Sequence, residues 1–247
     1  MSEWKSFKNH VKVSILSTIS LRESFFLQSF FMLVSNLVFF SFWWIYFSNF
    51  KSVKGWTLSD IACLYGIVNG AYGLFSVFLG GTRYIARMIF EGDLDTLIIK
   101  PKGLLLQIVA SKSMSMGWGD ILSSCVFFSL SSHLSLSSLP FLVLFLSSTC
   151  LIITSFSIVM GSLAFWIGDS HTLSKQLFEF LLTFSNYPKS IYAGAIKIFL
   201  LTVIPSGFIG FVPVDVIKEP SLAGVFSVIG FSMAYAYFAR RIFYIGL

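Results

Sequence analysis

Charge is scarce in this 247-residue chain. Charged residues make up 11% of it, whereas a soluble globular domain carries about 25%. Hydrophobic residues make up 56%, among them 29 Phe and 6 Trp, and so many apolar side chains exclude an intrinsically disordered chain. The apolar runs continue for about 20 residues, the length of a helix that crosses a bilayer, and do not alternate as in a membrane β-barrel. The expected fold class is an all-α integral membrane protein.

Motifs for nucleotide binding and catalysis are missing too. A P-loop requires GxxxxGK[ST], and the chain has no Gly-Lys pair. HExxH, CxxC and GxSxG are absent. The histidines and cysteines are scattered, without the spacing of a metal site: His10, His133, His171, Cys63, Cys125 and Cys150. No serine lies beside a base, so an intramembrane enzyme is disfavoured. We expect no catalytic residue, metal or cofactor on this chain.

The N-terminus lacks the pattern of a signal peptide, because basic residues are scattered through residues 1–22. Four apolar residues recur at helical spacing with lysines between them: Trp4, Phe7, Val11 and Ile15. This pattern favours a helix in the lipid headgroup region, apolar side down; a polar tail is the alternative.

Six membrane crossings are expected. Five lie at residues 24–47, 58–79, 104–132, 140–167 and 221–239, and the one before the last lies either at 172–187 or at 190–211. In the second, Gly66 and Gly70 form a small-xxx-small pattern that allows close contact between helices. Asp60 lies at the start of that helix, where the helix dipole favours an anion.

Three further charges fall within the expected helices. Lys112 and Asp120 interrupt the third; we expect Lys112 to extend to the surface and Asp120 to find a partner on another helix. Glu179 follows Lys175 by four residues, which predicts a weak ion pair.

Prolines interrupt residues 188–213. Tyr187-Pro188, Pro205 and Pro213 break the apolar run, because proline removes a backbone donor and displaces the preceding turn. Two arrangements fit. Either a crossing ends near Asn186 and two short helices dip back into the outer half of the membrane, or 172–188 lie on the inner surface and 190–211 cross.

The distribution of Lys and Arg predicts the orientation. With the N-terminus inside, twelve of the 17 lie on the inner side and five on the outer side, which places both termini in the cytoplasm. The net charge of +6 therefore reflects Lys and Arg held at the cytoplasmic face. Since the basic residues are dispersed over loops that flank the membrane, we expect no nucleic-acid partner.

Charge clusters in one internal stretch, residues 80–103. Residues from Thr82 to Phe90 predict a short helix that ends at Glu91-Gly92. Asp93-Leu94-Asp95 then opens a second short segment, with carboxylates where the dipole prefers them, and Lys100-Pro101 ends it. Composition alone also allows an ordinary basic cytoplasmic loop.

The string FEGDLDTLIIKP and the prolines after Asn186 resemble the permease subunits of ABC-2 type exporters, over nearly the whole chain. The resemblance implies one domain, 1–247, with an interfacial helix, six crossings, and a region re-entrant from the outside at 188–213, marked by Tyr187, Pro188, Pro205 and Pro213. It implies a cytoplasmic coupling helix that contacts an ATPase through these residues: Arg83, Arg87, Phe90, Glu91, Gly92, Asp93, Leu94, Asp95, Lys100 and Pro101.

The resemblance also implies partners. Two separate ATPase subunits would carry ATP and Mg²⁺, and a second permease, identical or paralogous, would complete an exporter in the inner membrane of a bacterium. Aromatic richness hints at a hydrophobic or amphipathic cargo. A secondary transporter or channel that needs no ATPase is the alternative.

Overall fold

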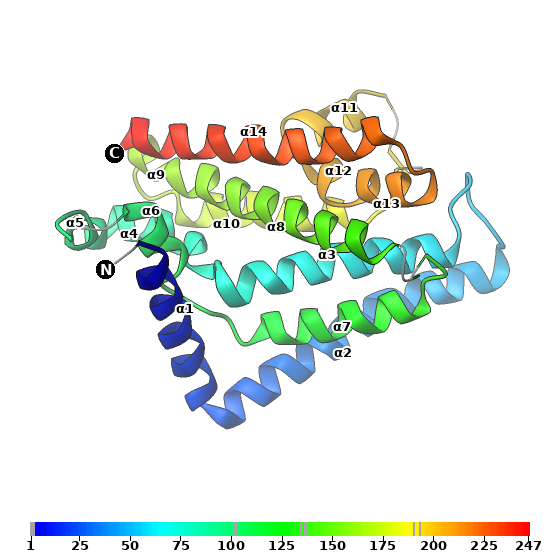
Figure 1. Ribbon diagram of the computed structural model, residues 1–247, viewed down its shortest axis with the longest axis horizontal. Coiled ribbons are helices and arrows are strands. Elements are labelled where there is room, and N and C mark those ends of the chain that lie inside the picture. Colours follow the sequence, from blue (N-terminus) through cyan, green and yellow to red (C-terminus); the bar gives the residue numbers. More distant parts are fainter. Residues whose placement is uncertain (1–2, 101–102, 134, 136–137, 190, 193) are drawn as a thin grey trace.

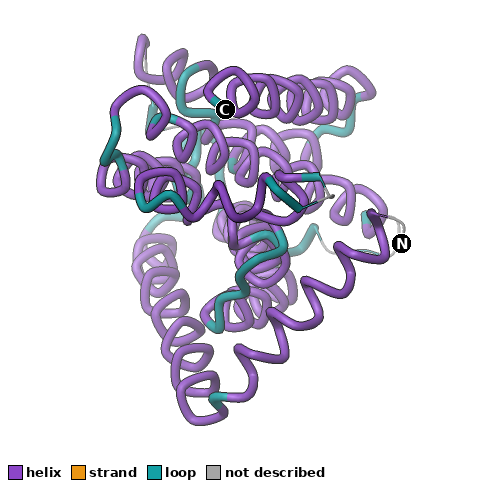
Figure 2. Tube along the Cα trace, turned by 90° about the vertical axis from the view of Figure 1, so that its left-hand side faces the viewer, coloured by secondary structure: helices purple, strands orange, loops and turns teal. Residues whose placement is uncertain are grey.

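The computed structural model describes all residues except 1–2, 101–102, 134, 136–137, 190 and 193. The described part is helical, with no strand beyond one isolated bridge. Long helices lie side by side, and both termini lie at the same end of the molecule (Figure 1). Viewed from that end, most helices are seen along their axes while α1, Glu3–Ser20, slants across them (Figure 2).

Four helices are long and apolar enough to cross a membrane: α2 Arg22–Asn49, α3 Leu58–Phe78, α8 Leu139–Ser162 with its continuation α9 Ala164–Ile167, and α14 Leu222–Gly246. Two more, α7 Met116–Leu130 and α10 His171–Ser185, have 15 residues each. At 1.5 Å per residue each is about 22 Å long, less than the ~30 Å hydrocarbon core. Six crossings therefore stay a prediction.

Helix α3 forms the centre of the bundle. In its apolar window 83% of the residues are buried, and it packs along α7 on one side and α8 on another. A Cβ added at Gly66 would meet the Phe128 ring at 2.7 Å. Ser124 Oγ donates to the Gly66 carbonyl oxygen at 2.6 Å. The close approach expected from the glycine spacing is confirmed.

The third predicted helix is not continuous, so the prediction of one helix over 104–132 was wrong. It is divided into α6, Leu104–Val109, and α7, with an irregular linker between them. Serines at 111, 113 and 115 lie in this linker, and serine is a weaker helix former than leucine. Met114 N donates to Ser76 O at 3.0 Å instead of to its own helix. Lys112 and Asp120 therefore do not share a helix.

The proline-rich region contains three short helices rather than two: α11 Gly194–Thr202, α12 Ser206–Ile209 and α13 Phe211–Lys218. Pro205 precedes α12, but Pro213 does not break the chain: it lies in the first turn of α13, where its missing N–H costs nothing. The Phe208 and Phe231 rings stack at 4.0 Å, which holds this region against α14 in the half of the molecule away from the termini (Figure 1).

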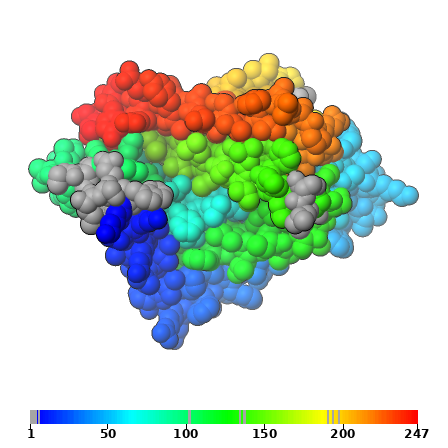
Figure 3. Space-filling model, viewed as in Figure 1, coloured from blue at the N-terminus to red at the C-terminus, as the bar shows by residue number. Residues whose placement is uncertain are grey.

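The edges of the bundle are formed by α14 and by α1 with α2 (Figure 3). Helix α14 runs to Gly246, beyond the predicted end at 239. In α1, Phe7, Val11 and Ile15 line a groove with Phe78, so its apolar side partly faces protein rather than lipid. The side chain of Trp4 lies outside the described residues.

Gly73→Ala tests the packing of α3 on α7. The added Cβ would lie 2.7 Å from Gly117 O and 2.9 Å from Ile121 N, and backbone atoms cannot rotate away. We expect a loss of about 1–3 kcal/mol, seen as a lower melting temperature in detergent. Gly230→Ala is the matched control, because nothing lies within 4 Å of a Cβ there. Equal melting temperatures for the two variants would contradict the packing described.

Candidate functional site

The charged segment, defined here as Gly80–Ile98, is a folded unit at the end of the molecule that carries both termini (Figure 1). It consists of the 3₁₀ helix η1 Gly80–Tyr84, α4 Ile85–Phe90 and α5 Asp93–Ile98. Gly92 separates α4 from α5 with a φ of 78°, a left-handed conformation that favours glycine. Glu91 and Gly92 thus end the first helix where the sequence predicted.

Two contacts fix the charged segment to the membrane helices. Ile85 is fully buried, and a Cβ at Gly161 of α8 would lie 2.7 Å from its Cβ. Leu94 is 4% exposed and packs in a cluster with Ile108 of α6 and Phe243 of α14. Leu94, predicted as a contact for a partner, is therefore an internal anchor. A segment packed in this way is not a loose tether.

The outer surface of the charged segment mixes apolar and charged side chains. Phe90 is 60% exposed and Ile99, just after α5, is 84% exposed. Around them lie exposed charged residues: Arg87, Glu91, Asp93, Asp95 and Lys100. Arg87 and Glu91 pair with each other at 2.8 Å, one helical turn apart. Pro101 lies outside the described residues.

Arg83 does not belong to that outer surface. Its side chain is 18% exposed and its guanidinium points to α10, where Nη2 lies 2.7 Å from Glu179 Oε1. Nη1 donates to Tyr72 Oη of α3 at 2.8 Å, and Cζ lies 4.7 Å from the centre of the Phe178 ring. The predicted pairing of Glu179 with Lys175 was therefore wrong. Arg83 connects the charged segment to α3 and α10.

Lys112 lies in the linker before α7, where its ammonium group is 3.8 Å from the centre of the Tyr84 ring. The side chain is exposed, at the end of the molecule that carries the charged segment. A cation over an aromatic ring is a favourable contact.

A cavity of about 330 Å³ lies between α2, α3 and α10. One face of each helix lines it, with residues spaced three or four apart: Met32, Ser35, Asn36 and Phe39 of α2; Tyr65, Val68, Asn69 and Tyr72 of α3; Glu179, Leu182, Thr183, Asn186 and Tyr187 at and after α10. Asp120 of α7 also lines it. Phe39 and Tyr187 are exposed while Asn36, Asn69 and Asp120 are buried, so the cavity opens between α2 and α10 and its inner wall is polar.

Asp120 is 1% exposed and lies in a polar network between three helices. Asn36 Nδ2 donates to Asp120 Oδ1 at 2.8 Å and to Ser123 Oγ at 3.0 Å, and Asn69 Nδ2 reaches Ser123 Oγ at 3.4 Å. The expected partner for Asp120 on another helix is confirmed, and it is an amide. Among the residues that the structure describes, none hydrogen-bonds Asp120 Oδ2.

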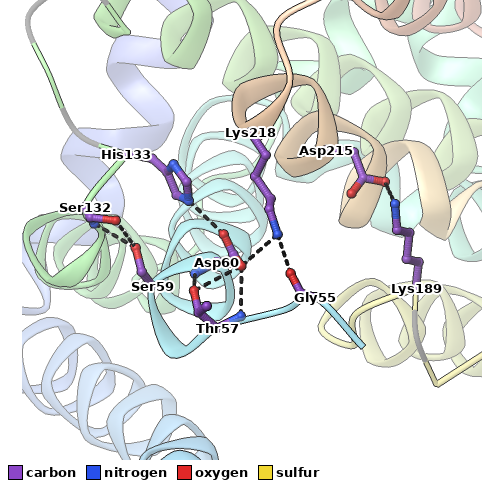
Figure 4. Close-up of polar contacts among 9 residues, drawn as sticks. All are labelled: Gly55, Thr57, Ser59, Asp60, Ser132, His133, Lys189, Asp215 and Lys218. Carbon is purple, nitrogen blue, oxygen red and sulfur yellow. Dashed lines mark hydrogen bonds and ion pairs between the residues drawn. The ribbon is translucent and has the colours of Figure 1, made fainter. Parts of the chain in front are cut away.

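A second polar cluster lies at the opposite end of the molecule, around Asp60 (Figure 4). Asp60 caps the start of α3 in a capping box with Thr57. Its Oδ1 lies 2.7 Å from His133 Nε2, and its Oδ2 accepts from Lys218 Nζ at 2.8 Å. Lys218 also donates to Gly55 O at 2.7 Å. Asp60 therefore joins α3 to the chain after α7 and to the end of α13.

A family model described as ABC-2 family transporter protein matches residues 14–247. The chain belongs to this ABC-2 transporter family. No curated protein and no solved structure matches the chain. Family membership and the long apolar helices make the chain a multi-pass membrane protein and the transport subunit, or permease, of an ABC transporter. ABC-2 permeases normally work with ABC ATPase partners.

Sequence reasoning missed the cavity. Its signal was present as polar residues at positions i, i+4 and i+7 of apolar helices: Tyr65, Asn69 and Tyr72 in α3, and Glu179, Thr183 and Asn186 in α10 and at its end. Polar side chains inside membrane helices face the interior of the bundle or a cavity. Their shared face on each helix could have been read from the helical period.

Lys218→Met tests the Asp60 cluster. It leaves a carboxylate that is 3% exposed without its main cationic partner, and hydrogen bonds to charged groups contribute about 1.5–3 kcal/mol. We expect a melting temperature several degrees lower in detergent. Lys189→Met is the control: it removes an ion pair to Asp215 whose partners are 41% and 32% exposed, worth about 1 kcal/mol or less. A larger loss in the control would show that the cluster does not hold this end together.

Proposed function

We propose that this chain is the permease of an ATP-driven exporter and that separate ATPase subunits act on the charged segment. The observation that carries the proposal is the connection made by Arg83. The charged segment presents an exposed surface, is anchored in the bundle by Leu94, and is joined through Arg83 to Glu179, which lines the cavity. Force applied to the surface at Phe90, Asp93 and Asp95 thus has a direct route to a wall of the cavity.

The proposed topology has both termini and the charged segment in the cytoplasm, in the inner membrane of a bacterium. Both termini and the charged segment share one end of the molecule (Figure 1). Lys112 and Lys175 lie near Tyr84 of the charged segment, whereas Lys218 pairs with Asp60 at the start of α3 and Lys189 pairs with Asp215 of α13 (Figure 4). An excess of Lys and Arg at the first end supports a cytoplasmic side there. Helices α7 and α10 would then be the third and fifth of six crossings.

We assign the movement to α10. ATP binding would draw two ATPase subunits together, push on the charged segment, and tilt α10 relative to α2 and α3. To shift a gate from 1:99 to 99:1 takes about 5.5 kcal/mol of differential binding. A packed segment with several close contacts can transmit such a difference, because it cannot yield locally without losing those contacts.

The region from Tyr187 to Pro213 would close the outer end of the path as a re-entrant segment. Tyr187 lines the cavity and lies 6.2 Å from the ring of Trp43 of α2. Pro188, Pro205 and Pro213 are buried, and Phe211 packs in the core with Leu64 of α3. Irregular backbone at membrane depth must be shielded by protein or line a watery path, and the packing here supplies that shield.

A second permease, identical or paralogous, would complete the transporter. In the apolar windows of α2 and α14 only 11% and 17% of the residues are buried, so both helices have large apolar faces for lipid or for another permease. Helix α2 borders the mouth of the cavity, which favours it as the side that the second permease covers.

The mixed apolar and polar lining of the cavity suits an amphipathic substrate.

A secondary transporter or channel is the alternative function, and it would need no ATPase. Purification in mild detergent separates the two. The proposed function predicts recovery of a P-loop ATPase in equal ratio with this chain, whereas transport by the chain alone on an ion gradient would support the alternative.

Asp93→Lys tests the role of the charged segment. The change reverses an exposed charge at the start of α5 without touching the core, so insertion should be intact, while stimulation of the partner ATPase should fall at least tenfold. Gly92→Pro should have the same effect, because proline cannot adopt the φ of 78° found there.

Glu219→Lys is the control for this experiment, since it makes the same charge change at an exposed position just after α13, at the opposite end. Wild-type stimulation in both Asp93→Lys and Gly92→Pro, measured in proteoliposomes with the co-purified ATPase, would refute the coupling role.

A further inference from the structure

The cavity is lined by two carboxylates, Glu179 and Asp120, and the contact with Arg83 of the charged segment accounts for only the first. Glu179 has its cation, because Arg83 lies 2.7 Å away. Asp120 has none: the described lining residues include no lysine, arginine or histidine, and its Oδ1 is held only by the neutral amide of Asn36. A buried charge without a partner of opposite sign is strongly unfavourable, so this site is electrostatically incomplete.

We propose that the cavity binds an amphiphilic cation, with Asp120 as the counter-charge of its ammonium group. The inference rests on the proposed function in one respect: it takes the bound cation to be the class of substrate that is transported. The ammonium group of the ligand would approach the Asp120 carboxylate, whose Oδ2 is buried and has no hydrogen-bond partner among the described residues.

The rest of the lining suits such a ligand. The rings of Tyr65 and Tyr72 lie on the same face of α3 as Asn69, and aromatic faces attract ammonium groups. Met32 and Leu182 offer apolar surface to the body of the ligand. At about 330 Å³ the cavity is near the lower end of small-molecule sites, about 300–1,000 Å³. It holds a head group and a short body, while a longer chain would leave through the mouth at Phe39.

Helix packing is the competing explanation for Asp120. The network with Asn36, Ser123 and Asn69 holds α2, α3 and α7 together, and polar contacts of this kind stabilise membrane helices. Helix packing explains the hydrogen bond that Oδ1 accepts, but it gives no role to Oδ2. A protonated Asp120 that serves only in packing would show no preference for a cation, and that difference can be measured.

The experiment uses the full chain in nanodiscs of zwitterionic lipid and three probes with one 2-phenylethyl body: the ammonium, the alcohol and the carboxylate. Ligand-detected NMR titration gives each dissociation constant. We expect the ammonium to bind at least tenfold more tightly than the alcohol and the carboxylate. The tenfold figure follows from the strength of one hydrogen bond to a charged group. Asp120→Asn keeps the size of the side chain but removes its charge, so it should reduce the preference to less than about twofold.

Asp169→Asn is the control, an exposed carboxylate between α9 and α10, and it should keep the preference. Should Asp120→Asn not fold, Thr183→Trp replaces it. Thr183 is an exposed residue at the cavity, and the indole should block the mouth and weaken binding of the ammonium at least tenfold. Equal affinity of wild type for ammonium and alcohol, a preference that survives Asp120→Asn, or ammonium binding that is unchanged in Thr183→Trp would overturn the proposal.

The proposed function and this site fail in different ways. Selective binding that depends on Asp120, together with an ATPase that does not respond to the ammonium, would leave the site in place and contradict transport of that class. Coupling that depends on Asp93, together with no selective binding, would overturn the site and leave the permease function in place.

Discussion

The guanidinium of Arg83 is the contact on which the functional arrangement depends. It comes from η1 in the charged segment, pairs with Glu179 of α10, and donates to Tyr72 of α3. The ion pair alone is worth little, since Glu179 is 47% exposed and half-exposed pairs contribute about 0–1 kcal/mol. Its importance is geometric. With the Phe178 ring 4.7 Å away, three partners hold one rigid planar group, which links the charged segment to both α10 and α3.

The remaining contacts join α2, α3 and α7 into one closely packed group. Helices α2, α3 and α7 are joined by the glycine face of α3 and by the network of Asn36, Asp120 and Ser123. At the far end, Asp60 fixes the start of α3 to Lys218. Helix α10 lies outside this group and has an exposed polar side. The cavity lies between this group and α10, so the proposed tilt of α10 would change its shape.

The sequence predicted those parts of the fold that depend on local pattern. The apolar runs of α2, α3, α8 and α14 are long enough to be recognised by length alone, and Gly92 marks the end of α4 because glycine tolerates the left-handed conformation. Leu94 shows the limit of that reasoning: the resemblance implied a contact with the ATPase there, and the fold buries Leu94 in a cluster that includes Phe243.

Contacts between distant residues could not be predicted, because one sequence contains no information on which residues pair. Arg83 and Glu179 are 96 positions apart, and Asp60 and Lys218 are 158 apart. The break before α7 depends on a hydrogen bond from Met114 N to Ser76 O. Local pattern favoured the wrong partner for Glu179, one turn away on its own helix. The cavity is the intermediate case, since its polar residues share one face of α3, but only the fold shows that three such faces meet.

The central claim is that the charged segment moves α10, and one distance measurement tests it directly. Nitroxide labels at Phe180 of α10 and Met233 of α14, both exposed, report the separation of these helices by double electron–electron resonance in the complex with the co-purified ATPase. We expect the distance to change when a non-hydrolysable ATP analogue binds, and the change to vanish in Arg83→Met. A distance that does not respond to the nucleotide, or that responds equally in Arg83→Met, would contradict the account.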